Sequence, residues 1–277
     1  MKQLQTGSFY GQTNQTTHLH GITITDTEYT LDKVDWHYHE NAYFTFILAG
    51  NVIEGNKKEV YHCPAGSLLF HNWHDPHYNI KPKGFTRGFH IELQKRWFDN
   101  LELKQDKLEG SFAIQNPDVK FLLYRIFKES KICDELTAMT VEMLLLQTLN
   151  KMQVNNAGMS RQIPAWVGKL KMLLADDPAR KHTLSELSGL LQLHPVHLSR
   201  DFSRYFNCTM GEYIRKLRVE KAFALLADDG SSLTDIAFTC GFADQSHFLR
   251  CFKQFGGSNP SAYRKLLLKK HVNSVLF

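Results

Sequence analysis

The sequence predicts a two-domain α+β protein, in which an antiparallel β-barrel with a helical pair precedes an all-α domain of two helix-turn-helix units joined by a linker helix. Three observations support this prediction. The chain has 277 residues, which suits two domains of roughly 100–150 residues each. Its first third consists of short apolar runs separated by glycine and proline, as in β-structure. Its final part has helical periodicity and contains two copies of one pattern.

Composition excludes several classes of protein. Hydrophobic residues make up 43% and charged residues 22% of the chain, so the sequence is neither disordered nor collagen-like. The longest apolar runs, such as 143–146, are far shorter than the ~20 residues of a membrane span, and the N-terminus lacks an apolar signal core. The five scattered cysteines form no CxxC pair, which favours a reducing compartment. We therefore expect a cytoplasmic protein that has no membrane partner.

Charge is divided unevenly along the chain. Residues 161–277 hold 17 lysines and arginines against 10 acidic residues, a net charge of +7, whereas the preceding part carries −2. Nine of the fourteen histidines lie before residue 91. A basic C-terminal part is typical of a protein that binds a polyanion. The histidine-rich, slightly acidic N-terminal part therefore predicts a second and different function.

The N-terminal domain is expected to span residues 1–116. Strand-like runs at 43–48 and 67–70 are rich in aromatic and aliphatic residues. Turn signals recur at short intervals, at Gly50, Gly55 and the proline-containing segments 64–66, 75–76 and 82–84. This spacing predicts a small antiparallel sandwich or barrel.

Helical periodicity begins after Pro117 and predicts a helical pair over residues 117–152. In the second helix, expected over 136–152, apolar residues recur close to i, i+3, i+7 spacing at Leu136, Met139, Met143, Leu146, Leu149 and Met152. Residues 153–163 are polar and include Asn-Asn and Gly, so we expect a linker there. Residues 164–268 are expected to form the helical domain and 269–277 a C-terminal tail.

The helical domain contains an internal repeat, whose copies read LSELSGLLQLHPVHLSRDF and LTDIAFTCGFADQSHFLRCF. The copies match at an offset of 49 residues, as in Leu193/Phe242, and at 50 after a slip of one residue, as in Phe202/Phe252. Two copies are too few for a solenoid, which needs about three. Each copy therefore predicts a short helix, a tight connection and a longer helix.

Each copy has the features of a DNA-reading unit. The first helix opens on a capping residue and an acid, which are Thr183 or Ser185 with Glu186 in one copy and Ser232 or Thr234 with Asp235 in the other. The second helix opens with Pro195 in one copy and after a cap at Asp244 in the other. Its face opposite the apolar stripe carries Val196, Ser199, Arg200 and Ser203, and then Gln245, Ser246, Leu249, Arg250 and Lys253. A helix fits the major groove of B-DNA, where Arg bonds guanine and Gln bonds adenine.

Between the copies, residues 210–226 predict one helix of about 17 residues, roughly 25 Å long at 1.5 Å per residue. Such a strut suits two recognition helices about one turn of DNA apart, ~34 Å. The alternative is a helical bundle whose arginines merely face water. The doubled pattern and the basic charge favour DNA.

Residues 164–268 resemble the DNA-binding region of the arabinose-regulator (AraC/XylS) family of bacterial transcription factors. The resemblance is carried by DIAFTCGFADQSHFLRCFKQFGGSNPSAYRK at 235–265. Asn259 departs from the Ser or Thr that usually precedes the proline, and we expect little effect. The resemblance implies base-facing positions at Val196, Ser199 and Arg200 in the first copy, and at Gln245, Ser246, His247 and Arg250 in the second.

Residues 20–95 resemble the cupin barrel and the cupin-like sensor domain that often precedes this DNA-binding region. His37 and His39 form an HxH pair on one strand face, and a Pro-Ala-Gly turn and then His77 follow. The glutamate of metal-binding cupins has no counterpart, because its position falls near Tyr43 or Phe44. Sensor domains of this kind bind an organic effector, so no cofactor is expected. If a metal ion binds, its candidate ligands are the three imidazoles of His37, His39 and His77.

The resemblance also implies an effector site in the barrel. The candidate effector-binding residues are Trp36, His37, His39, Trp73 and His77. Tryptophan and histidine at a barrel mouth suit a sugar, and plain packing of these residues is the alternative. His71, His74 and His77 recur at a spacing of three, but in a turn rich in Trp, Pro and Asp we expect this spacing to be incidental.

Together these features predict a transcription regulator, not an enzyme, whose DNA binding or activation is controlled by a small-molecule effector. The expected partners are double-stranded DNA, the effector, a second copy of the chain through the helical pair at 117–152, and RNA polymerase if the protein is an activator. One alternative is a metal-dependent cupin enzyme with a helical appendage. Another is a constitutive DNA-binding protein whose barrel only oligomerises.

Overall fold

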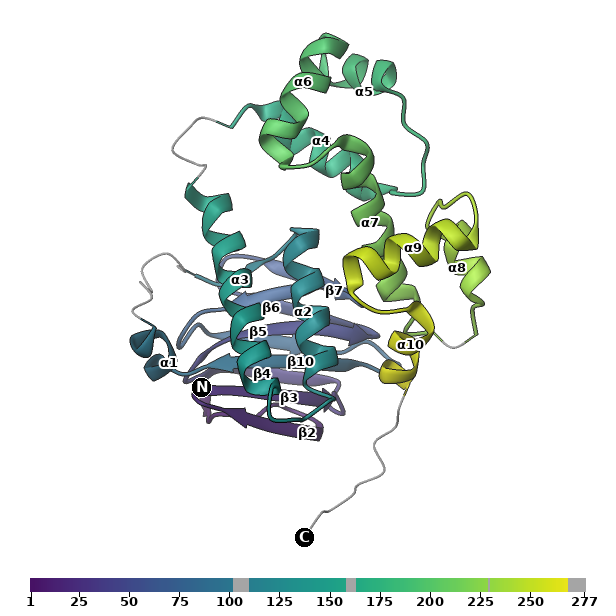
Figure 1. Ribbon diagram of the computed structural model, residues 1–277. Helices are drawn as coiled ribbons and strands as arrows, with labels where there is room; N and C mark the ends of the chain where they lie inside the picture. Colours follow the sequence, from purple (N-terminus) through teal and green to yellow (C-terminus); the bar gives the residue numbers. More distant parts are fainter. Residues whose placement is uncertain (102–109, 158–162, 229, 269–277) are drawn as a thin grey trace. The chain divides into compact units, whose positions relative to one another are not determined.

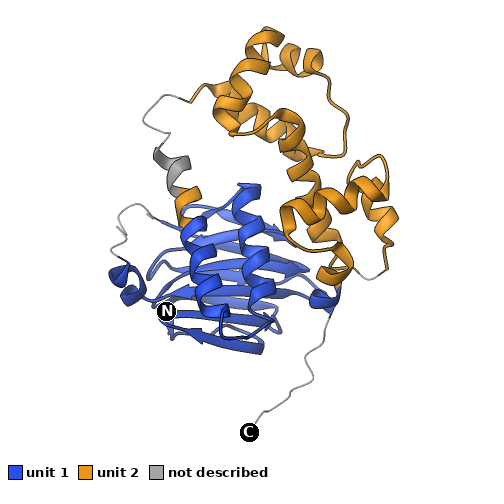
Figure 2. Ribbon diagram, in the orientation of Figure 1, with its two compact units in different colours: residues 1–148, 265–277 blue, residues 149–264 orange. Residues whose placement is uncertain are grey.

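The computed structural model describes residues 1–101, 110–157, 163–228 and 230–268. The chain forms two compact units, residues 1–148 with 265–277 and residues 149–264 (Figure 2). The first unit is rich in strands and the second is helical. The predicted two-domain α+β organisation is therefore confirmed, while the predicted tail at 269–277 and residues 158–162 of the predicted linker lie outside the described residues.

The elements of the N-terminal part are labelled in Figure 1. Its strands are β1 (Lys2–Leu4), β2 (Gln12–Leu19), β3 (Ile22–Glu28), β4 (Lys33–His39), β5 (Ala42–Ala49), β6 (Asn51–Asn56), β7 (Val60–Pro64), β8 (Leu68–His71), β9 (His77–Ile80), β10 (Arg87–Leu93) and β11 (Phe112–Ala113). Its helices are α1 (Lys95–Asn100), α2 (Pro117–Glu129) and α3 (Thr137–Ala157).

The strands form two sheets, of order β1-β4-β9-β6-β7 and β11-β8-β5-β10-β3-β2. Successive strands from β3 to β6 alternate between the two sheets, so the chain builds a sandwich. Each sheet ends in edge strands, so among the described residues the pairing does not close into a barrel, and of the two predicted alternatives the structure has the sandwich. The strands pair antiparallel as predicted, except that β1 pairs with β4 in parallel among the described residues.

Strand β5 shows how the sequence specifies the two faces of the larger sheet. Its run of apolar residues is buried on both sides, as expected for a strand covered on both faces. Tyr43 and Thr45 face the space between the sheets. The alternate residue Phe46 packs edge-on against Tyr124 of α2, at 4.5 Å between ring centroids. Helix α2 therefore covers the outer face of this sheet (Figure 1).

Helix α3 differs from the prediction in where it ends and in which of its apolar residues are buried. It continues to Ala157, so residues 153–157, expected as part of a linker, are helical. The expected stripe divides between two faces: Leu149 and Met152 are buried, whereas Leu136 and its followers at 139 and 143 are exposed. Val141 and Leu145 are buried instead, because the sheet-facing side of the helix runs through these positions.

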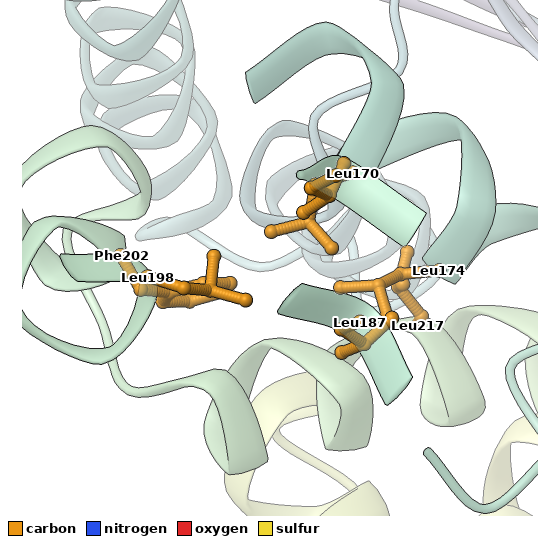
Figure 3. Close-up of a cluster of buried hydrophobic side chains, with 7 residues drawn as sticks. Leu170, Leu174, Leu187, Leu198, Phe202 and Leu217 are labelled. Carbon is orange, nitrogen blue, oxygen red and sulfur yellow. The ribbon is translucent and has the colours of Figure 1, made fainter. Parts of the chain in front are cut away.

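The C-terminal part consists of helices α4 (Ala165–Asp176), α5 (Leu184–Leu191), α6 (Pro195–Phe206), α7 (Met210–Leu225), α8 (Leu233–Thr239), α9 (Gln245–Gly256) and α10 (Pro260–Leu268). Helices α4 to α7 share one core, formed by Leu170, Leu174, Leu187, Leu191, Leu198, Phe202 and Leu217 (Figure 3). A second core joins α7, α9 and α10, where the ring of Phe223 contacts those of Phe252 and Tyr263. Each copy of the repeat therefore packs on one half of α7.

A membrane span would need a helix that is both long and strongly apolar. Among the helices that the structure describes, none meets this requirement.

Candidate functional site

The two copies of the repeat turn in the same way. The short helix of each copy is followed by a residue in the left-handed region, Gln192 with φ +54° directly after α5 and Gly241 with φ +84° two residues after α8. The amide of the next residue, Leu193 or Phe242, donates to the carbonyl five residues earlier, at 2.9 and 3.0 Å. These positions differ by 49, so the offset found in the sequence is an equivalence of backbone conformation.

For each of the short helices α5 and α8, the sequence offered two candidate capping residues, and the structure distinguishes them. Thr183 caps α5 and accepts a hydrogen bond from the amide of Glu186 at 3.1 Å. Ser232 caps α8 in a capping box with Asp235, in which each side chain bonds the other residue's backbone. In each predicted pair, the cap is therefore the residue that comes first in the sequence, Thr183 in one copy and Ser232 in the other.

The recognition helices α6 and α9 begin as predicted. Pro195 is the first residue of α6, where its missing N–H leaves no bond unmade. Asp244 caps α9, and its side chain accepts from the amide of His247 at 2.7 Å. Their starts are separated by 50 residues, which places the one-residue slip of the repeat in the turn.

Helix α6 separates its buried and exposed faces cleanly. Leu198 and Phe202 are buried in the core. All four predicted DNA-contacting residues of this helix are exposed to solvent, namely Val196, Ser199, Arg200 and Ser203. The Arg200 guanidinium bonds the Asp201 carboxylate and lies 3.1 Å from Nδ1 of His197. One helix face thus offers a cation, hydroxyls and the apolar Val196 to a partner.

Helix α9 shows the same division, with an aromatic core face made of Phe248, Phe252 and Phe255. Of the predicted DNA-contacting residues, Ser246, Arg250 and Lys253 are exposed, whereas Gln245 and His247 are half-buried. The hydroxyl of Thr234 donates to Oε1 of Gln245 at 2.9 Å. The ring of His247 packs edge-on against Phe242 at 5.4 Å between centroids. These two residues are therefore held in place by the short helix and its turn.

Helix α7 joins the two copies. It has 16 residues, close to the 17 predicted, and Leu226 is its C-cap. At 1.5 Å per residue it is about 24 Å long. Thr209 caps it and accepts from the amide of Glu212 at 3.2 Å. A single continuous helix therefore sets the separation of α6 and α9.

The N-terminal unit holds a cavity between its two sheets, of about 470 Å³ including its open mouth. Aromatic, imidazole and carboxyl side chains from both sheets and from the N-terminal segment form its wall. The lining residues are Phe9, Tyr10, Tyr29, Leu31, Val34, His37, His39, Tyr43, Thr45, Val52, Glu54, His77, Asn79, Lys81 and His90.

Burial sets the charge state of this interior. It lowers the pKa of His39 to about 3 and also lowers the pKa of His71 and of His77. Burial raises the pKa of Glu54 to about 8 and that of Glu92 to about 7. At neutral pH the imidazoles are therefore neutral and the Glu54 carboxyl carries a proton.

Among the described residues, two groups of three side chains have the spacing of metal ligands, and both include His77. The first is the predicted set of His37, His39 and His77. In it, Nδ1 of His37 lies 2.9 Å from the Asp35 carbonyl and Nδ1 of His77 lies 3.2 Å from the Asp75 carbonyl. As donors to these carbonyls, both imidazoles keep Nε2 as the atom with a free lone pair.

The second group consists of Glu54, His71 and His77, from strands β6, β8 and β9. Oε1 of Glu54 lies 3.5 Å from Nε2 of His71. The rings of His71 and His77 have centroids 5.0 Å apart. His71 and His77 come together because strands β8 and β9 both contribute to this group, and His74 does not join them, so the spacing of three along the sequence does not build it.

The predicted effector residues divide between the cavity and other surroundings. His37, His39 and His77 line the cavity, whereas neither tryptophan belongs to its lining. Trp36 is 40% exposed and packs against Tyr78, and Trp73 packs against Phe98. The aromatic side chains of the lining are therefore those of tyrosines and Phe9 and not of tryptophan.

Sequence reasoning missed Glu54 and His90, which also line the cavity. Glu54 follows the apolar pair Val52 and Ile53 in β6, and His90 lies between Phe89 and Ile91 in β10, so a polar residue at an inward position was the available signal. Using that signal requires knowing which face of the strand is inward.

An apolar face lies at the start of α3, made of Leu136, the residue just before the helix, and of Met139 and Met143 within it, with 54%, 56% and 54% exposure. Their spacing of three and four residues places them on one side of the helix. Exposed apolar residues gathered on one face are typical of an interaction surface.

Comparison with known proteins identifies the C-terminal part. Residues 187–266 match a family model described as a helix-turn-helix domain. The melibiose operon regulatory protein of Escherichia coli is 31% identical over 107 residues, which are 39% of this chain and 35% of that protein. The chain thus matches about a third of that relative's length. The HTH-type transcriptional activator RhaR of Mannheimia succiniciproducens is 24% identical over 259 residues, covering 84% of this chain and 88% of that protein. The solved structure of ToxT from Vibrio cholerae aligns over 89% of this chain and 99% of that chain, with 15% identity and a TM-score of 0.38.

Proposed function

We propose that the chain, which carries a helix-turn-helix domain over residues 187–266, is a member of the AraC/XylS family and a sequence-specific DNA-binding transcription regulator controlled by a small molecule. Its relatives are named as regulators of transcription. In this proposal it works in the cytoplasm and is not an enzyme, and double-stranded DNA is its main partner. RNA polymerase is a further partner if the protein activates, as the name of the RhaR relative says of that protein.

The observation that carries the proposal is the doubled recognition helix. Helices α6 and α9 each follow a tight turn, bury one aromatic or aliphatic face and expose the other. The exposed faces carry Arg200 and Arg250 at matching positions of the two copies. An arginine on an exposed helix face bonds guanine O6 and N7 in the major groove. Two such helices on one strut would read neighbouring segments of the groove.

Basic residues around these faces would neutralise DNA phosphates. Lys253 at the last turn of α9 is exposed and lies beyond the residues that reach base edges. Each phosphate contact adds to the dependence of affinity on salt, because bound counterions are released. We therefore expect affinity to fall steeply as the salt concentration rises.

The cavity of the N-terminal unit is the proposed effector site. Its wall combines aromatic rings with imidazole, carboxyl and amide groups, which suits a small polar organic molecule such as a sugar. His37, His39 and His77 remain the proposed contacts from the original set, joined by Tyr43. An effector would control DNA binding through its different affinity for two arrangements of the protein.

The apolar face of α3 is the proposed dimer contact. A second copy of the chain would cover Leu136, Met139 and Met143 with its own matching face, as in a symmetric dimer. Met143→Glu should shift the protein toward monomer in sedimentation analysis. Met172→Glu, the same substitution at an exposed methionine of helix α4, is the matched control and should leave the dimer intact.

The direct test of the proposal is selection of bound duplexes from a random DNA pool by the purified full chain, with and without candidate metabolites. We expect one enriched sequence of two half-sites, whose yield changes with an effector. Recovery of unenriched DNA in every condition would contradict the proposal.

A further inference from the structure

The imidazole of His71 is buried in the N-terminal unit, and one of its nitrogen atoms makes no hydrogen bond within the described residues. It is 1% exposed, and its Nε2 atom has no hydrogen-bond partner within the described residues. A polar atom in this position is costly unless a bound group satisfies it.

The nearest polar group is the carboxyl of Glu54, itself 3% exposed. Its Oε1 lies 3.5 Å from Nε2 of His71, and the pair does not form a hydrogen bond. Its Oε2 accepts from the amide of Asn79 at 3.1 Å, which fixes the carboxyl plane. With His77, these residues offer three ligand atoms within 4.8 Å of one another.

This spacing fits a small cation. Ligand atoms that each lie about 2.0–2.2 Å from a tetrahedral zinc ion are roughly 3.3–3.6 Å from one another. Oε1 of Glu54 and Nε2 of His71 are already this far apart. Only the side chain of His77 would have to move closer for all three atoms to reach one ion.

Neighbouring groups orient both imidazoles. Nδ1 of His77 pairs with the carbonyl of Asp75, which directs Nε2 inward. The ring of Tyr43 stacks on that of His71 at 4.2 Å and 9°. The hydroxyl of Tyr43 lies 3.0 Å from Nε2 of His77, so an ion would have to replace the hydroxyl proton there.

We propose that Glu54, His71 and His77 bind one divalent transition-metal ion, of which zinc is the type. Two neutral imidazoles and one carboxylate are a donor set that such ions prefer, and binding of the ion would release the proton of the Glu54 carboxyl to water. The three-imidazole group also contains His77, but it offers no carboxylate to balance the charge of the ion. Glu54 and His77 both line the cavity, so water there can complete the coordination.

The test uses the full chain without a histidine tag, stripped with a chelator and then titrated with Zn²⁺ and Co²⁺. We expect one ion per chain, a tetrahedral visible spectrum for Co²⁺ and a higher melting temperature. Absence of stoichiometric binding by the folded protein would overturn the proposal. Metal binding does not depend on DNA binding, so failure of one leaves the other standing.

Three variants assign the ligands. Glu54→Gln and His71→Phe keep the shape of each side chain and should each weaken zinc binding at least about 100-fold. His39→Phe, in the three-imidazole group alone, should bind zinc nearly as wild type does. The opposite pattern, with loss in His39→Phe and none in the other two, would overturn the assignment.

Tyr43→Phe keeps the ring that stacks on His71 and removes the hydroxyl proton that competes with an ion for Nε2 of His77. Because this variant should not lose zinc binding, it separates a loss of ligands from a general effect of mutating the cavity. It should bind zinc as tightly as wild type or more tightly. Weaker binding by this variant, with the apo protein still melting cooperatively, would make the phenol a ligand and overturn the three-residue set.

Discussion

The guanidinium Nε of Arg200 lies 3.0 Å from Oδ1 of Asp201, the next residue of helix α6. Both lie at the surface, and Arg200 is one of the proposed base-reading residues. Asp201 therefore holds the arginine in place and, in the role proposed for Arg200, would compete with DNA for it. The equivalent of Asp201 in the second copy is Cys251, so the two recognition helices differ in this respect.

Asp201→Asn should tighten DNA binding by about two- to fivefold, because it frees the guanidinium and removes a negative charge near the phosphates. The measurement is a titration of the selected duplex by fluorescence anisotropy at fixed salt. Weaker binding by this variant would mean that the ion pair positions Arg200 for DNA and does not compete with it.

Arg250→Ala and Lys253→Ala should differ in kind. Loss of a bidentate contact to one base should cost ~1–3 kcal/mol of binding and relax discrimination at one base pair, whereas loss of a phosphate contact should weaken all sequences alike. Affinities for every single-base variant of the selected duplex distinguish the two. An equal loss on every sequence for Arg250→Ala would refute its role as a base reader.

Gly241→Ala should destabilise the C-terminal unit by about 1–3 kcal/mol. The residue has φ +84°, and an added Cβ would lie 2.6 Å from the Cα of Ala179. Gly168→Ala is the control, because it lies in helix α4 with nothing within 4 Å of the added atom. It should instead stabilise by about 0.5–1 kcal/mol. Thermal melting compares the two, and equal effects would show that Gly241 is not needed for the turn.

The N-terminal unit should lose stability in acid through Asp26. Arg87 bonds this carboxylate through two nitrogens, at 2.6 and 2.7 Å, and Lys131 adds a third contact at 2.5 Å. Burial alone would raise the pKa of Asp26, but the two cations outweigh it and hold the pKa below its usual value. The stabilisation is therefore complete above a pH of about 4 and is lost as the pH falls through the native pKa.

Asp26→Asn should lower the stability of this unit at neutral pH by about 3–5 kcal/mol, since it leaves two buried cations without their anion. It should also flatten the stability below pH ~4, where the wild type declines. Tryptophan fluorescence during urea unfolding follows this unit, which holds Trp36, Trp73 and Trp97. The same decline in both proteins would assign acid sensitivity to other groups.

The C-terminal helices could be predicted closely because their signals are local. Caps, the proline at residue 195 and apolar spacing fix where a helix starts and which face is buried, and they need no knowledge of distant residues. The duplication supports the same prediction, because two copies of one pattern are expected to turn alike, and Gln192 and Gly241 both have positive φ. The predicted strut and both buried faces are confirmed for that reason.

The N-terminal unit could be predicted only in outline, since its decisive contacts are non-local. Whether strands close into a barrel depends on pairings across the whole domain, as the parallel pairing of β1 with β4 shows. Glu54 and His71 meet although 17 residues separate them, and no spacing rule connects two different strands. In α3, apolar residues occur both on the buried face and on the exposed face, so the sequence pattern alone does not show which of them pack against the sheet.

The most direct measurement of the central claim is competition between the selected duplex and random-sequence DNA for the full chain at moderate ionic strength. Because two recognition helices with base-reading arginines would supply specificity, we expect a preference of at least about 10³-fold for the selected duplex. A ratio near one, from protein that is folded and binds DNA, would contradict the account.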